Sequence, residues 1–122
     1  ENNNEGIKCV IHGDPVFTNV IKTESGIKFI DMRGKTTKNT IYGDLHYDYA
    51  KIHQSLMGYD FILNNIEIND GYLKTLREAF YKHCNVSDIN LLTASLYFTL
   101  LPLHEYDEDK FDRYKNIIED LM

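Results

Sequence analysis

Several features that would classify a protein at once are scarce in this 122-residue chain. It has two cysteines, Cys9 and Cys84, too few for the disulfide framework of a small secreted domain. We therefore expect reduced thiols and a cytoplasmic protein. No apolar stretch approaches the ~20 residues that span a membrane, and no signal peptide is visible. Basic residues are also few, since the chain has 13 Lys and Arg residues against 19 Asp and Glu residues. That balance disfavours nucleic acid as the main partner.

The chain nevertheless has enough apolar material to fold. Hydrophobic residues make up 43% of it, and nine tyrosines and six phenylalanines predict a core rich in aromatic rings. The length indicates one domain covering residues 1–122. There are no internal repeats, and the only low-complexity tract is the short asparagine run at residues 2–4.

Residues 8–34 contain the most informative pattern. A short apolar run leads to Asp14, and Asn19 follows five positions later. Two β-prone segments then flank the turn signal at residues 23–26, and the second ends in Asp31. Because a hairpin returns the chain on itself, we expect the oxygen-bearing side chains of all three residues to converge at one end of a small sheet.

That convergence suits a hard cation and a hydroxyl nucleophile. Mg²⁺ prefers oxygen ligands and often takes only one or two from the protein, with water and phosphates completing the shell. Asn19 and Asp31 could supply those two, which leaves Asp14 to accept the proton of an attacking hydroxyl. The simpler alternative is turn chemistry, in which Asp and Asn are common.

The same residues resemble a known family. His12-Gly13-Asp14 with Asn19, followed by Ile30-Asp31, is similar to the H-G-D-x-x-x-x-N, hairpin, apolar-Asp motif of the aminoglycoside phosphotransferase and choline kinase family. The segment at 43–51 resembles that family's G-D-x-x-x-D-L-A-K block. More narrowly, HGDPVFTN, IDMRG and YGDLHYDYAKIHQSLMG resemble kinase-like modules encoded with bacterial capsule and surface-polysaccharide genes. Where the family often has an aromatic residue after the second aspartate, this chain has Met32.

The resemblance implies an ATP- and Mg²⁺-dependent phosphotransferase that acts on a hydroxyl of a sugar, amino sugar or amino alcohol. By likeness to the family, a buried Asp48 would hold the backbone of the catalytic loop through hydrogen bonds. We interpret His12 as a buried, hydrogen-bonded histidine that braces the loop rather than transferring protons. Arg33 and Lys35 could contact a phosphate or an anionic sugar, although a solvated basic loop explains them equally well. The family's glycine-rich loop and strand lysine have no counterpart here. We therefore expect a C-terminal lobe whose N-terminal lobe, in the same protein, is the missing partner.

The remainder of the chain predicts helices. We expect them over residues 44–57, from 70, over 88–101 and over 108–121, with Asp44 and Ser87 as caps and Gly58 and Pro102 as stops. Residues 61–68 fit either an extended segment or a continued helix. The helix at 88–101 is apolar nearly all round, which predicts a central, buried position. The expected class is α+β, mainly α: a catalytic loop and metal-binding hairpin at 8–34, packed on the four or five helices of a subdomain at 43–122.

Two further functions remain open from the sequence alone. A metal-dependent hydrolase would use His12 and Asp14 as ligands, but His46 and His53 have no partners at ligand spacing. The second open function is that of a non-catalytic binding or regulatory module in a larger polysaccharide-assembly protein. The acceptor cannot be named, because no motif fixes the side chains of a substrate pocket.

Overall fold

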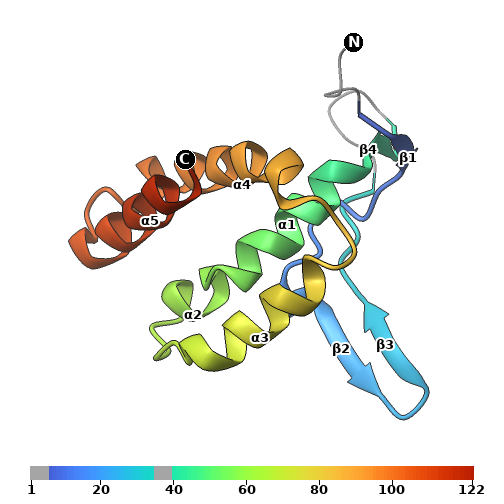
Figure 1. Cartoon of the computed structure of the whole chain (residues 1–122), viewed down its shortest axis with the longest axis horizontal. Coiled ribbons are helices and arrows are strands. Elements are labelled where there is room, and N and C mark those ends of the chain that lie inside the picture. The colour runs from blue at the N-terminus through green and yellow to red at the C-terminus, as the bar shows by residue number, and fades with distance from the viewer. Residues whose placement is uncertain (1–5, 35–39) are drawn as a thin grey trace.

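The computed structural model of the chain describes residues 6–34 and 40–122. It is an α+β structure, mainly helical, in which five α-helices accompany two small antiparallel sheets in the described ranges (Figure 1). The coarse class predicted from the sequence is therefore confirmed.

The strands form two separate pairs. β1 (Lys8–Val10) pairs with β4 (Tyr42–Asp44), and β2 (Val20–Thr23) pairs with β3 (Gly26–Phe29), both antiparallel. A 3-10 turn, η1 (Phe17–Asn19), immediately precedes β2. The hairpin was predicted, but β4 was not. A three-residue segment containing glycine and aspartate has little β propensity of its own and forms a strand only through its partner.

The hairpin does not pack on the helices as the sequence predicted. Every residue of β3 is exposed, and only the two ends of β2 are half-buried. Figure 1 shows β2 and β3 extending away from the helical body. The hairpin meets the remainder of the protein at its base instead, where His12 Nε2 lies 2.7 Å from the Ile30 carbonyl and the Arg33 N–H donates to the His12 carbonyl at 2.8 Å.

The helices begin close to where their caps predict. α1 spans Leu45–Leu56 behind the Asp44 cap, whose carboxylate accepts from the His46 N–H. The others are α2 (Tyr59–Leu63), α3 (Asp70–Phe80), α4 (Val86–Leu100) and α5 (Glu108–Leu121), with a 3-10 turn, η2, at Pro102–His104. The cap of α4 is Asn85 rather than Ser87, because the Asn85 side chain accepts from the Ser87 N–H.

The core lies where α2, α4 and α5 meet. Ile62, Tyr97 and Tyr114 are fully or almost fully buried there. The predicted stripe of α5 is confirmed in its centre, since Tyr114 has no exposed surface. The two tyrosine rings lie 5.6 Å apart in a tilted arrangement, and burial raises the pKa of Tyr114 to about 12.

The prediction that α4 is buried on all sides was wrong. α1 and α5 cover one face of it, and that face holds Ile89, Thr93, Ala94 and Tyr97. On the other face Leu91 is 69% exposed and Phe98 is 64% exposed. By length and composition the segment Val86–His104 could also cross a membrane, contrary to expectation. The buried face shows that this helix contributes to the core of the folded chain.

Candidate functional site

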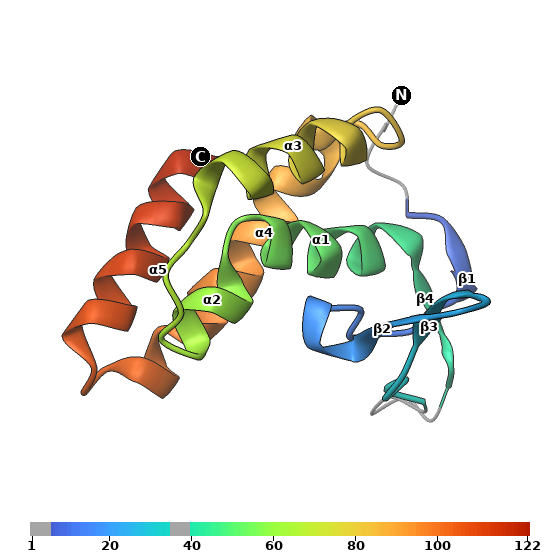
Figure 2. The same cartoon turned by 90° about the horizontal axis from the view of Figure 1, so that it is seen from below.

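One face of α1 holds the loop that was predicted to be catalytic. Asp48, Lys51 and Ser55 stand at positions i, i+3 and i+7, so they share that face. Figure 2 shows η1 and the chain leading into it alongside α1. Each of the three side chains contacts this segment, so the site is built from α1 outward.

Asp48 accepts two hydrogen bonds from the loop backbone. Its Oδ2 accepts from the His12 N–H and its Oδ1 from the Gly13 N–H, both at 2.8 Å. These are the bonds that the sequence predicted, although Asp48 is half-buried rather than buried. Two turns of helix further on, Ser55 Oγ accepts from the Phe17 N–H at 3.0 Å. The loop is therefore fixed to α1 before and after Asp14.

Asp14 is held through both of its carboxylate oxygens. Lys51 Nζ lies 3.4 Å from Oδ1, and Asn19 Nδ2 donates to Oδ2 at 3.2 Å. The same Asn19 amide nitrogen donates to the Asp14 carbonyl at 2.9 Å. About half of the Asp14 side chain is exposed, so the carboxylate is oriented by two donors and can still be reached from solvent.

The third predicted residue, Asp31, lies on a segment fastened to this loop. The Ile30 N–H donates to the Asn19 carbonyl at 2.9 Å, and the Arg33 N–H donates to the His12 carbonyl at 2.8 Å. Asp31 stands between these two bonds with a left-handed φ of +54°, which aspartate tolerates better than most residues. The backbone of Asp31 is thus beside the Asp14 loop, while convergence of its carboxylate with the side chains of Asp14 and Asn19 stays a prediction.

His12 connects the two segments. Its Nδ1 accepts from the Asp14 N–H at 3.1 Å, so the ring proton must be on Nε2, which lies 2.7 Å from the Ile30 carbonyl and donates to it. The ring is therefore the neutral Nε2–H tautomer, with both nitrogens bonded to backbone. That arrangement matches the bracing role expected of His12.

Arg33 packs against the loop instead of extending freely into solvent. Its guanidinium lies 5.1 Å from the centre of the Tyr47 ring, a cation–π distance. Its side chain also covers Gly13, where an added Cβ would come 2.7 Å from the Arg33 Cβ. Contact between Arg33 and a substrate stays a prediction, and Lys35 lies outside the described residues.

The donor set can be compared with what a metal ion needs. Among the described residues there is no group of three or more His, Cys, Asp or Glu side chains arranged to hold a metal. Asn19 turns its amide nitrogen to Asp14, so its Oδ1 is free of that contact. An amide oxygen and the Asp31 carboxylate are hard ligands, and such a set fits Mg²⁺ only if phosphate oxygens and water complete the shell.

Sequence reasoning missed Lys51 and Ser55. The signal was available, since both lie on the helix face that already carried Asp48, one and two turns later. Comparisons with protein-family models, curated proteins and solved structures found no match to this chain. The functional assignment therefore depends on the residues and their geometry.

Proposed function

We propose that this chain is the C-terminal lobe of a kinase-like phosphotransferase that transfers the γ-phosphate of ATP to a hydroxyl of a sugar, amino sugar or amino alcohol. The observation that carries this proposal is the placement of Asp14, in direct contact with Asn19, beside a segment that holds Asp31. A role in the cytoplasmic stage of bacterial capsular or surface-polysaccharide synthesis follows from the family resemblance.

Each residue has a distinct task in this proposal. Asp14 orients the acceptor hydroxyl and takes its proton as the oxygen attacks the γ-phosphorus and the bond to ADP breaks. Lys51 and Asn19 keep the Asp14 carboxylate in position. Bound between Asn19, Asp31 and the phosphates, Mg²⁺ would neutralise charge on the transferring group.

The rigidity of the loop supports the same proposal. Phosphoryl transfer depends mostly on positioning and charge stabilisation, and a loop held at His12, Gly13 and Phe17 meets the first need. A purely regulatory module needs no oriented, solvent-reachable carboxylate at this point. We expect the 122-residue chain alone to bind ATP weakly and to be inactive in phosphate transfer, because nothing in its described part resembles a glycine-rich loop over the phosphates.

The first experiment locates the metal. Mn²⁺ replaces Mg²⁺ in a solution of ¹⁵N-labelled chain and ATP, and its paramagnetism broadens nearby amide signals. We expect broadening centred on Asn19 and Asp31, and its loss in Asp31→Asn. Asp112→Asn, an exposed change on α5, is the matched control and should leave the broadening unchanged. Broadening spread evenly over the acidic surface, or unaltered in Asp31→Asn, would contradict the site.

The second experiment tests the reaction. The chain is titrated with Mg²⁺-ATP by calorimetry and assayed for transfer to a panel of sugars and amino alcohols, beside the Asp14→Asn variant. Micromolar affinity with turnover would show that the chain is complete in itself and that the nucleotide site has been misplaced. Metal binding at Asn19 and Asp31 without transfer, even when the full parent protein is assayed, would favour the regulatory alternative.

A further inference from the structure

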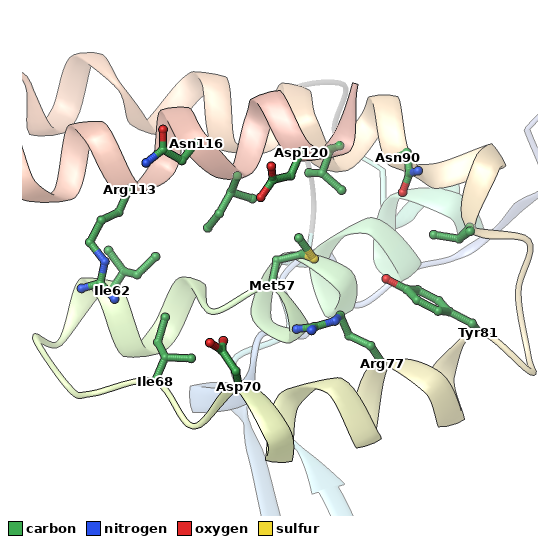
Figure 3. Close-up of a pocket in the computed structure, with 13 residues that line it drawn as sticks. Met57, Ile62, Ile68, Asp70, Arg77, Tyr81, Asn90, Arg113, Asn116 and Asp120 are labelled. Atoms are coloured by element: carbon green, nitrogen blue, oxygen red, sulfur yellow. The ribbon is translucent and has the colours of Figure 1, made fainter.

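A cavity lies away from Asp14. It occupies about 600 Å³ between α3 and α5, with α2 and α4 at its sides, and Met57, Ile68 and Leu121 supply apolar surface (Figure 3). Figure 2 shows α3 on one side of α1 and η1 on the other. None of the residues that hold the Asp14 loop lines this cavity, so it needs an explanation of its own.

The two long walls carry charges in a regular pattern. α3 contributes Asp70 and Arg77, and α5 contributes Arg113 and Asp120. Each pair is spaced i, i+7, which places both members on one helix face two turns apart. Figure 3 shows the four side chains extending toward the space between the helices. Each wall therefore presents one positive and one negative group.

These charges do not neutralise one another across the cavity. Within the described ranges, none of the four forms an ion pair with another of the four at 4 Å or less; Arg113 lies 3.8 Å from Asp109 of its own helix. Arg77 uses one guanidinium nitrogen to donate to the Leu56 carbonyl at 2.9 Å, which fixes its position and leaves other donors. The charged groups of the two walls are therefore not paired with one another within 4 Å.

A neutral acceptor adds to this pattern. Asn90 also lines the cavity, and its Oδ1 is shielded from solvent without a hydrogen-bond donor among the described residues. A buried amide oxygen without a donor costs free energy, so such atoms normally meet a ligand, an ion or water. Here an N–H group from a ligand would satisfy it.

We propose that this cavity binds a small aliphatic zwitterion, of the class of an α-amino acid with a branched or thioether side chain. A simple anion would meet two carboxylates, and a simple cation would meet two guanidinium groups. A ligand with one charge of each sign pairs its carboxylate with an arginine and its ammonium with an aspartate and Asn90 Oδ1. The aliphatic side chain then covers the half-buried Met57, Ile68 and Leu121. This inference goes beyond the proposed phosphotransferase and does not depend on it.

The test uses L-leucine and two analogues that each lack one charge, 4-methylpentanoate and 3-methylbutylamine. Each is titrated into the ¹⁵N-labelled 122-residue chain, and chemical shifts of amides around the cavity are followed. Affinities near millimolar are ordinary for so small a ligand. We expect saturable shifts with leucine and binding at least tenfold weaker with either analogue.

Variants on the α5 wall complete the design. Asp120→Asn should weaken leucine binding by about tenfold, equivalent to ~1.4 kcal/mol. Glu119→Gln removes a charge from the neighbouring exposed position, outside the cavity lining, and should leave the affinity unchanged. Equal affinity for leucine and its analogues, stronger shifts with glucose, or no saturation up to ~10 mM leucine would each overturn the proposal.

Discussion

Replacing Asp48 by alanine tests how the candidate site is held in place. The change removes both acceptors for the His12 and Gly13 N–H groups while leaving the remainder of α1 intact, because alanine is a strong helix former. If Asp48 acts as a support, the loop should lose its anchorage ahead of Asp14 and the fold should lose stability.

The magnitude follows from those two bonds. A buried donor left without an acceptor costs about 1–3 kcal/mol. Asp48 is only half-buried, so water can partly replace it, and the two losses together should amount to ~1–3 kcal/mol rather than twice that. For a domain of this size, each kcal/mol lowers the melting temperature by roughly 4 °C. We expect Asp48→Ala to melt about 4–12 °C below wild type.

The measurement is urea and thermal unfolding of Asp48→Ala, Asp48→Asn and the control Asp112→Ala. Asparagine keeps one acceptor oxygen, so Asp48→Asn should lose an intermediate amount. Asp112 is exposed on α5, and its side chain forms no hydrogen bond or ion pair with the described residues. If Asp48→Ala melts like the control, and the His12 and Gly13 amide resonances do not move, Asp48 does not support the loop.

Two other predictions concern pH and backbone. Burial, with a smaller effect of nearby Arg77, lowers the pKa of the fully buried His53 to about 4 from its ordinary 6.5. As the pH falls below 6.5, His53 takes up a proton in the unfolded chain before it does so in the folded protein. The contribution of His53 to the unfolding free energy should therefore be constant above pH 6.5 and fall by up to about 3 kcal/mol toward pH 4. A His53 ring that titrates near 6.5 in the folded protein by NMR would refute this. Gly13→Ala should destabilise the fold by more than about 1 kcal/mol, because the Gly13 φ is +91° and the new methyl group meets Arg33. In the control Gly34→Ala, φ is +70° but the methyl group enters open space, so this variant bears only the backbone strain and should melt at a higher temperature than Gly13→Ala.

Local signals in the sequence predicted most of the fold. Asp44 is both a favourable cap and the start of a periodic apolar pattern, and α1 begins directly after it. α5 spans Glu108–Leu121, as its stripe predicted. In the site, the spacing of Asp14, Asn19 and the hairpin predicted which segments meet, because those constraints act within some twenty residues.

What the sequence could not predict depends on contacts between distant segments. Leu91 and Phe98 are apolar, but they would be buried only if further helices packed on their face of α4. The sequence of α4 alone does not determine how many helices pack on it. β4 exists only through its pairing with β1. Lys51 contacts Asp14 only because α1 lies against the loop. Its position three residues after Asp48 on the helix indicated that it shares that face.

The attachment of the loop to α1 has a consequence for how sequences of this type can diverge. Asp48 and Ser55 bind backbone N–H groups of His12, Gly13 and Phe17, and almost any residue supplies such a group. These hydrogen bonds therefore require Asp48 and Ser55 on the helix but allow many residue types in the loop, because the loop contributes only backbone groups. Related chains could change much of the loop and keep its path, whereas loss of the Asp and Ser spaced seven apart on the helix would release it.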